Sequence, residues 1–289
     1  PVERAAPLTN PLQAAGFSVV DIPMLSLEAR PTTEQDMALM RQWFAGDYQA
    51  LVIVSPTAAA SGLAVWQALE HERQAQLAEV NNSAQKDVSF KGLTAPSHLI
   101  AVGEATAAVL NDAKLDATNY QVLQPLIANN EGMLAMPEID SLQAGDKLLV
   151  WRGLGGRRLL VNTLQARGVH IDSIAWYERK MPNDAMAQYK EWYAQYLNQK
   201  SEQPRPIVIV SSGTAFEHWQ AIVTEVAAQK ANAEKSNRAP LQLNDFAYVV
   251  LGEHLANMVA GQDLSYWRVE DLAPETIVAA IHTPLVDCS

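Results

Sequence analysis

The chain repeats itself once, and this internal repeat limits its fold more than any other feature. Three landmarks occur twice in the same order, the second copy roughly 150 residues after the first. The pairs are 12–16 with 164–168, 52–58 with 209–215, and 102–104 with 251–253. One match arises easily by chance, but three in the same order do not. We therefore predict two similar halves, and two copies are too few for a solenoid.

Apolar runs rich in β-branched residues occur in both halves, as is typical of strands that are buried on both faces of a sheet. Each run is followed by a small polar or glycine-containing turn and then by a helical pattern, which predicts parallel α/β sheets. The predicted strands are 51–54, 98–102, 147–151, 207–210 and 248–251. The predicted fold class is therefore α/β, with two similar doubly wound parallel-sheet domains.

The two halves differ at their starts. The helix around Leu164 follows the strand 147–151, but the matching helix around Leu12 has almost no sequence before it. We expect the first strand of the first half to be missing from the given residues, or truncated. Charged segments at 71–91 and 229–240 lie at corresponding places. They are expected to be loops, because a duplicated scaffold tolerates surface insertions at matching positions.

Composition excludes several classes of function. A net charge of −11 argues against general nucleic-acid binding but permits a local anion site. No run approaches the roughly 20 apolar residues of a membrane span, so we expect a cytoplasmic protein. The single cysteine, Cys288, cannot form a disulfide within the chain. The six histidines lack metal-ligand spacing, and Glu70, His71 and Glu72 are expected on a solvated helix surface, so no metal site is predicted.

Seven short motifs follow one another along nearly the whole chain. They are residues 12–16 (LQAAG), 55–58 (SPTA), 101–107 (AVGEATA), 152–157 (RGLGGR), 177–179 (YER), 211–215 (SSGTA) and 274–276 (PET). Each motif alone is weakly specific. In this order and at this spacing, they resemble the uroporphyrinogen-III synthase family.

The resemblance implies a particular domain organisation. Two α/β domains are expected to be joined by a two-stranded β connector, with the active cleft between the domains. One domain is expected to combine residues 1–21 with 181–289, and the other to span 29–171. The connector strands are expected at 22–28 and 172–180.

The resemblance also implies an activity. Members of the family cyclise hydroxymethylbilane, a carboxylate-rich linear tetrapyrrole, with loss of water and inversion of the last ring, which gives uroporphyrinogen III for haem biosynthesis. No cofactor is implied. The expected partner is an anionic linear tetrapyrrole, handed over by hydroxymethylbilane synthase to a monomeric enzyme. Because the uncatalysed reaction closes the ring without inversion, the enzyme must control geometry and exclude side reactions.

Turns that contain hydroxyl groups or glycine are the predicted substrate-binding groups. Doubly wound sheets bind ligands beyond the carboxyl ends of their strands, where helix N-termini can hold carboxylates. The turn residues are Ser55, Thr57, Gly103, Thr106, Ser211, Ser212, Thr214 and Gly252. Ordinary helix capping is the alternative for each of them.

The loop that contains Arg152, Gly153 and Arg157 is a further candidate for binding carboxylates. Arginine and backbone amides suit such ligands, and the alternative is a tight turn with solvated arginines. The glycine spacing fits neither a Rossmann fingerprint nor a Walker motif.

Tyr177 is, by the resemblance, the candidate catalytic residue. It is expected in the connector, facing the cleft, where it would assist departure of the substrate hydroxyl as an acid. The alternative is an aromatic side chain packed beside Trp176. Leu255 stands in the second glycine motif where Thr106 stands in the first, which weakens the case for a threonine contact there. Two other interpretations therefore stay open, a non-catalytic two-lobed binding or sensor protein and an inactive family member.

Overall fold

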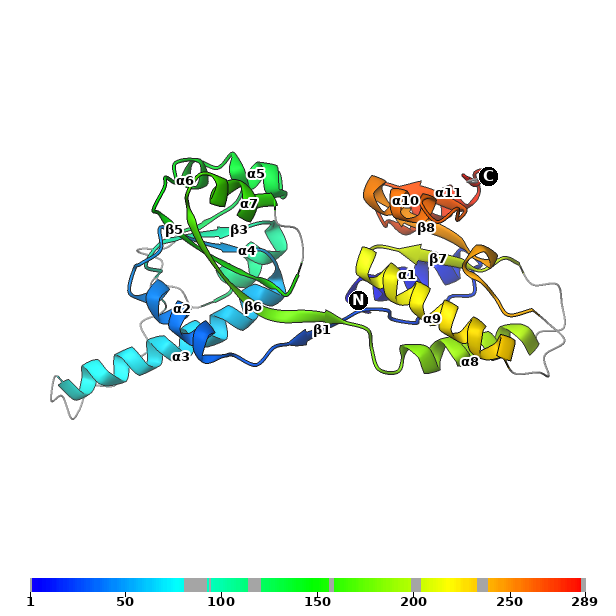
Figure 1. Cartoon of the computed structure of the whole chain (residues 1–289), viewed down its shortest axis with the longest axis horizontal. Coiled ribbons are helices and arrows are strands. Elements are labelled where there is room, and N and C mark those ends of the chain that lie inside the picture. The colour runs from blue at the N-terminus through cyan, green and yellow to red at the C-terminus, as the bar shows by residue number, and fades with distance from the viewer. Residues whose placement is uncertain are drawn as a thin grey trace. The chain divides into compact units, whose positions relative to one another are not determined.

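A computed structural model (Figure 1) describes residues 2–80, 93, 95–113, 121–155, 159–198, 204–232 and 239–286. The chain forms two compact units. Unit 1 consists of Pro1–Leu27 and Arg179–Ser289, and unit 2 consists of Glu28–Glu178. The chain therefore passes from one unit to the other twice, and each unit is described by itself.

Unit 2 is built on a sheet with the strand order β1-β6-β5-β2-β3-β4. The strands are β1 (Ser26–Ala29), β2 (Ala50–Ile53), β3 (His98–Ala101), β4 (Val122–Leu123), β5 (Lys147–Gly153) and β6 (His170–Lys180). Every neighbouring pair from β6 across to β4 is parallel. Strands β2, β3 and β5 confirm the three apolar runs that the sequence predicts in this part of the chain.

Helices cover both faces of this sheet, as a doubly wound fold requires (Figure 1). They are α2 (Glu34–Phe44), α3 (Pro56–Val80), α4 (Glu104–Asn111), α5 (Asn130–Leu134), α6 (Pro137–Asp140) and α7 (Leu159–Ala166). Leu51 and Ile53 share one core with residues of α2, α3 and α4. Val52 and Val150, on the other face, pack with residues of α5, α6 and α7. Burial of both faces explains why the strands are apolar at successive positions.

Tryptophan dominates the core between the sheet and helices α2 and α3. Trp43 packs edge-on against Trp66 and Trp151, with ring centroids 4.8 and 5.9 Å apart, and Trp151 packs edge-on against Trp176 at 5.9 Å. Helix α3 approaches this cluster at Gly62, where a Cβ would collide with the Trp151 ring. This packing holds α3 against β5 and so positions the turn between β2 and α3.

Unit 1 is built on a parallel sheet in the order β7-β8-β9. Its strands are β7 (Ile207–Val210), β8 (Ala247–Leu251) and β9 (Tyr266–Val269). Its helices are α1 (Val2–Ala14), α8 (Ala185–Asn198), α9 (Gly213–Asn232), α10 (Gly252–Ala260) and α11 (Pro274–Ile281), with a short 3-10 helix at Leu243–Asp245. Strands β7 and β8 confirm the two runs predicted here.

Helices also cover both faces of the unit 1 sheet. Residues of α8, α9 and α10 pack with Tyr248 and Val250, whereas residues of α1 and α11 pack with Val249 on the opposite face. Helix α1 begins at Val2, and no described strand pairs with the second edge of β7. The expectation that the first strand of this half is missing from the given residues, or truncated, therefore stays a prediction.

Strands β1 and β6 run side by side where the chain passes between the units. The Ser26 hydroxyl donates to the Lys180 carbonyl at 3.3 Å, and the Arg30 amide donates to the Trp176 carbonyl at 2.9 Å, so the two strands run antiparallel. The resemblance predicts a connector strand at 172–180. The structure has one continuous strand there, and most of its length pairs with β5 inside unit 2.

The loop expected at 71–91 is wrong for its first ten residues, because α3 continues to Val80. Residues 71–80 contain no glycine or proline and are mostly good helix formers, so nothing in their sequence ends the helix. Helix α9 likewise continues to Asn232, into the loop expected from residue 229. Residues 81–91 and 233–238 lie outside the described residues.

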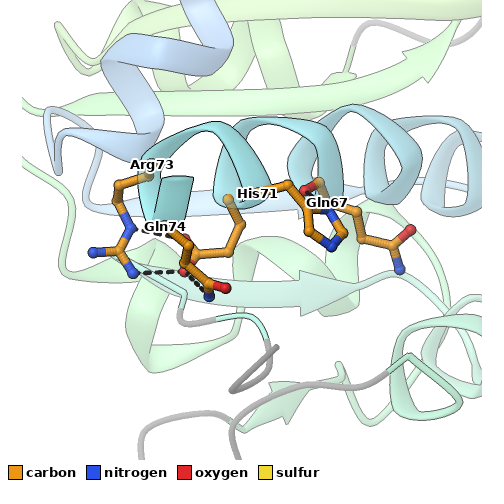
Figure 2. Close-up of polar contacts among 5 residues, drawn as sticks. Gln67, His71, Arg73 and Gln74 are labelled. Atoms are coloured by element: carbon orange, nitrogen blue, oxygen red, sulfur yellow. Dashed lines mark hydrogen bonds and ion pairs between the residues drawn. The ribbon is translucent and has the colours of Figure 1, made fainter. Parts of the chain in front are cut away.

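Glu70 is buried, although the sequence predicts Glu70, His71 and Glu72 together on a solvated surface. The Glu70 side chain is 2% exposed and accepts hydrogen bonds from Arg73 at 2.5 and 2.9 Å and from Gln74 at 2.7 Å (Figure 2). His71 and Glu72 are exposed, as predicted. A buried carboxylate needs a cation and hydrogen-bond donors, and the spacings of three and four residues along the helix supply both.

Within the described ranges, none of the helices combines the length and apolar character needed to span a membrane. The same part of the chain contains no group of three or more His, Cys, Asp or Glu residues that could hold a metal ion. Cys288 lies outside the described residues.

Candidate functional site

Three of the predicted turns lie at the same edge of the unit 2 sheet. Strands β5, β2 and β3 are neighbours in parallel register, with Ile53 opposite both Trp151 and Ala101. The register continues one residue further, because the Val54 amide donates to the Trp151 carbonyl and the Val102 amide donates to the Ile53 carbonyl, both at 3.1 Å. The turns after these strands therefore meet at the carboxyl edge, where doubly wound sheets bind ligands.

Tyr177 joins this edge from the adjacent strand, β6. The pairing of β5 with β6 shifts between Arg152 and Gly153, so that Gly153 lies opposite Tyr177 and not opposite Trp176. The Leu154 amide then donates to the Tyr177 carbonyl at 2.7 Å. Irregularities of this kind turn a side chain in a new direction. Here the irregularity brings the phenol ring of Tyr177 against the backbone of Gly153.

Gly153 leaves the space that the Tyr177 ring fills. A Cβ at residue 153 would stand 2.5 Å from ring atoms Cε2 and Cζ and 3.0 Å from the phenolic oxygen. No other residue fits there unless the ring moves. The reason is different at Gly155 in the same loop, where a φ of +76° favours glycine.

Ser55 links the phenol to the start of α3. Its hydroxyl donates to Tyr177 Oη at 3.1 Å, and its Oγ accepts from the Ala58 backbone amide at 3.2 Å, as a helix N-cap does. Tyr177 is only 2% exposed, whereas Ser55 is half-buried and Pro56 is exposed. Of the two bonded hydroxyl-bearing residues, Ser55 is therefore the more accessible to solvent.

Arg152 turns back onto its own loop. Its guanidinium donates to the Gly153 carbonyl at 3.2 Å and also to the Gly155 carbonyl. The arginine therefore shapes the loop that follows β5, which agrees with the tight turn of the alternative interpretation but not with its solvated arginine. Arg157 lies outside the described residues.

Gly103 and Thr106 begin helix α4 after β3. Gly103 is the N-cap residue, and its carbonyl accepts the Thr106 amide at 2.9 Å. Thr106 is 3% exposed, and Leu255, at the same place in the second copy, is 6% exposed. Both units bury this position, which explains why an apolar residue is accepted there. Thr57, in the first turn of α3, is half-buried.

In unit 1, the predicted turns also lie together at the carboxyl edge of the sheet. Strands β7 and β8 are parallel and in register, with Val210 opposite Val250. Ser211 and Ser212 follow β7 directly, and Gly252 follows β8, so these predicted residues come together at one edge.

Two of the unit 1 turns lead directly into helices. The Ser212 carbonyl accepts the Phe216 amide at 3.0 Å, and Thr214 lies in the first turn of α9, half-buried. Gly252 begins α10 with a φ of +73°, a conformation that favours glycine. The backbone therefore explains this glycine whether or not a ligand binds.

Exposed apolar side chains lie around the carboxyl edge of the unit 2 sheet, a feature that was not predicted from the sequence. Val54 follows β2 directly, Leu154 follows β5 directly, and both are exposed, as are residues 126–127 before α5. The segment that contains residues 126–127 passes close to Gly103, because a Cβ added at residue 103 would lie 3.5 Å from Cβ of Ala128. For β2 and β5 the available signal was an apolar residue immediately after the strand. Such groups beside helix N-termini suit a ligand with both apolar and anionic parts.

Two of the tyrosines with raised pKa values, Tyr48 and Tyr248, are held by hydrogen bonds. Tyr48, at the opposite end of β2, donates to Asp172 at 2.8 Å, and burial together with this carboxylate raises its pKa above the usual range. In unit 1, burial raises the pKa of Tyr248 to about 12, and its hydroxyl donates to the Leu243 carbonyl at 2.8 Å. Both phenols are therefore neutral at physiological pH.

Comparison of the sequence with known proteins gives a consistent result. The sequence pattern of a family described as uroporphyrinogen-III synthase HemD matches residues 6–266. The uroporphyrinogen-III synthase of Escherichia coli K12 is 27% identical over 127 residues, which are 43% of this chain and 46% of that protein. The enzyme of the same name from Salmonella typhimurium LT2 is 35% identical over 80 residues, 27% of this chain and 30% of that protein. The matches thus span less than half the length of these curated relatives.

A solved structure resembles the whole chain. It is a mutant uroporphyrinogen III synthase from the extreme thermophile Thermus thermophilus, with a TM-score of 0.55 at 12% identity, and the comparison covers 96% of this chain and 94% of that one. At this identity the likeness concerns the fold. It supports the mixed α/β architecture with parallel sheets described above.

Proposed function

The chain belongs to the uroporphyrinogen-III synthase family, and we propose that it is a cofactor-independent cyclising lyase that converts hydroxymethylbilane into uroporphyrinogen III. The observation that carries the proposal is the meeting of Tyr177 with the serine and glycine turns at the carboxyl edge of the unit 2 sheet. A phenol that can donate a proton lies there beside helix N-termini that can hold carboxylates. The reaction needs both.

The chemistry assigns a role to each group. Tyr177 assists departure of the substrate hydroxyl, which leaves a reactive azafulvene. The substituted carbon of the last pyrrole attacks it, and the spiro intermediate then fragments and recloses with that ring inverted. In unit 2, backbone amides at the turns of Ser55, Thr57 and Gly103 hold carboxylates. Arg152 fixes the loop around Gly153.

Unit 1 has equivalent turns of its own. Ser211, Ser212, Thr214 and Gly252 lie at the carboxyl edge of its sheet, at the starts of α9 and α10. Helix N-termini there are also suited to carboxylate groups. Thr106 is left out of the proposed contacts because its side chain is buried.

The exposed apolar residues at the unit 2 edge suit the pyrrole rings. Val54 and Leu154 lie next to Ser55 and Gly153 in the sequence and offer apolar surface near the phenol. Contact with them would exclude water from the azafulvene and limit side reactions. This is the control that the uncatalysed reaction lacks.

Supply of the substrate completes the proposal. Hydroxymethylbilane closes spontaneously without ring inversion, so a short transfer from hydroxymethylbilane synthase favours the inverted product. We propose that the protein receives its substrate in this way, as a monomer in the cytoplasm.

Isomer analysis tests the proposed function. Hydroxymethylbilane is generated in situ by hydroxymethylbilane synthase, the purified chain is added, and the products are oxidised and separated into type I and type III isomers. We expect mainly type III with the chain present and type I when it is omitted. Type I alone in both reactions would reject the enzyme and leave the non-catalytic interpretations.

A further inference from the structure

We propose that Ser55 relays the proton between Tyr177 and the substrate, so that the group in contact with the departing hydroxyl is the serine and the phenol acts behind it. The inference rests on the proposed function. It adds to that function a second hydroxyl in series with the tyrosine.

Burial separates Tyr177 from solvent and leaves Ser55 accessible. Tyr177 is 2% exposed and belongs to the main core of unit 2, with its ring against Gly153. Ser55 is half-buried, and its Oγ lies 3.1 Å from the phenolic oxygen. A substrate at the carboxyl edge therefore meets the serine hydroxyl before it meets the phenol.

The hydrogen-bonding capacity of Ser55 matches a relay. A serine hydroxyl has one donor and two acceptor positions. The Ala58 amide occupies one acceptor position at 3.2 Å. Without substrate, the serine proton is donated to Tyr177 Oη. Because both hydroxyls rotate, the tyrosine can instead donate to the second acceptor position, and the serine proton then points out to the substrate.

The start of α3 supports the transfer. Ser55 caps this helix, so its oxygen lies at the end where amide groups favour negative charge. As the serine gives up its proton, the Ala58 N–H stabilises the charge that develops on Oγ. This contact needs no reorganisation, because it already exists in the free protein.

The step balances without a further reactant. The substrate hydroxyl takes the Ser55 proton while its bond to the methylene carbon breaks, and the electron pair of that bond leaves with water. Ser55 takes the proton of Tyr177 in the same step, which leaves a phenolate and a cationic azafulvene. When the inverted ring recloses, the unsubstituted carbon of the last pyrrole loses its proton, and this proton returns through Ser55 to Tyr177.

A double-mutant cycle in single-turnover reactions tests the relay. Ser55→Ala, Tyr177→Phe and the double variant are compared with the wild-type chain for the rate of type III formation. Each single variant should lose about a hundredfold or more in rate, since general acid catalysis contributes about a hundredfold to ten-thousandfold. If the hydroxyls act in series, the double variant should match the slower single variant within about twofold. Effects that multiply in the double variant, or a wild-type rate for Ser55→Ala, would overturn the relay.

Two further measurements separate a relay from loss of structure. Ser55→Thr retains a hydroxyl and should recover most of the rate. The rate is also measured in mixtures of light and heavy water and plotted against the deuterium fraction of the solvent. The plot for the wild type should be curved, because two protons move in one step. The plot for Ser55→Ala should be a straight line. A straight line for the wild type would contradict the relay.

The matched control removes a capping hydroxyl elsewhere in unit 2. Thr33 caps α2, with its Oγ1 accepting the Asp36 amide at 3.1 Å. Thr33→Ala should keep the wild-type rate and the curved dependence of that rate on deuterium fraction. Type I product from the wild-type chain would reject the proposed function and the relay with it, whereas type III product with a full-rate Ser55→Ala would reject the relay alone.

Discussion

The ring of Tyr177 lies directly against the backbone of Gly153, so closely that a Cβ on residue 153 would stand 2.5 Å from two ring carbons. The shift in pairing between β5 and β6 produces this approach. The position of the phenol is therefore set by a residue that has no side chain.

Gly153→Ala should displace the phenol and slow the reaction. We expect a loss of about tenfold to a hundredfold in the single-turnover rate, since small displacements of a catalytic group have effects of that size. Overpacking should also lower the free energy of unfolding by about 1–3 kcal/mol. In a Tyr177→Ala background the same change should cost less than about 1 kcal/mol, because the ring is absent. Urea titration of all four proteins measures this, and equal costs in both backgrounds would disprove the contact.

Arg73→Ala should destabilise unit 2 by leaving the Glu70 carboxylate buried with only Gln74 as donor. Removing one partner of a fully buried pair costs about 3–5 kcal/mol. Arg73 is 47% exposed, so solvent screening reduces the expected loss in urea titration to about 1–3 kcal/mol. Arg41→Ala, which removes a cation from the exposed surface of α2, is the control and should cost less than about 0.5 kcal/mol. Equal losses for the two variants would argue against the buried pair.

The Glu70 pair should also give unit 2 an acid-sensitive component of stability. Burial opposes ionisation of Glu70, but hydrogen bonds from Arg73 and Gln74 outweigh it and hold its pKa below the usual range. A lowered pKa stabilises the fold above the unfolded value of about 4.3, and this stability is lost as the pH falls through the folded pKa. Urea titrations at a series of pH values on both sides of about 4.3 measure this. As the pH falls, the free energy of unfolding should decrease less for Glu70→Gln than for the wild type. The same loss in both proteins would show that another group is responsible.

Tyr248→Phe should change the alkaline stability of unit 1. Burial raises the Tyr248 pKa to about 12 in the folded protein, whereas an unfolded tyrosine titrates near about 10. The neutral form stabilises the fold fully below about pH 10, and this stability is lost as the pH rises toward the folded pKa. At neutral pH the free energy of unfolding of the variant should be about 1 kcal/mol lower, because the hydrogen bond to the Leu243 carbonyl is lost. As the pH rises above about 10, its free energy of unfolding should fall less steeply than that of the wild type. If the free energy of unfolding fell equally steeply in alkali for both proteins, the raised pKa of Tyr248 would be contradicted.

Leu255→Thr tests whether the missing threonine of the second glycine motif weakens activity. Leu255 is 6% exposed and packs in the core of unit 1, close to Gly213. A hydroxyl buried there should lower the free energy of unfolding by about 1–3 kcal/mol. It should not raise the rate of type III formation, because the position does not face solvent. A faster reaction would revive the case for a threonine contact at this turn.

Much of the fold could be predicted because its causes are local. β-Branched apolar runs predicted β2, β3, β5, β7 and β8, and the helical patterns after these runs predicted that strands alternate with helices. The repeat predicted that the two halves are similar. Strand β4 has only two residues, Val122 and Leu123, too few for a periodic signal. The length of α3 is harder to predict because its charged residues suggest a surface loop, although no residue in 71–80 breaks a helix.

The features of the fold and of the candidate site that could not be predicted depend on the tertiary structure. Glu70 carries the same charge as Glu72, and only packing makes one buried and the other exposed. The contact of Gly153 with Tyr177 depends on an irregularity in strand pairing, which leaves no mark in the sequence. The turn residues themselves were predictable, because parallel strands in register carry the turns after them to one edge.

Fluorine NMR of Tyr177 tests the location of the site most directly. All tyrosines are replaced by 3-fluorotyrosine, the Tyr177 signal is assigned by its loss in Tyr177→Phe, and uroporphyrinogen III is added without oxygen. We expect the Tyr177 signal to shift as the product binds, while the signal of Tyr248, buried against α9, stays in place. Saturation of binding with an unmoved Tyr177 signal would contradict it.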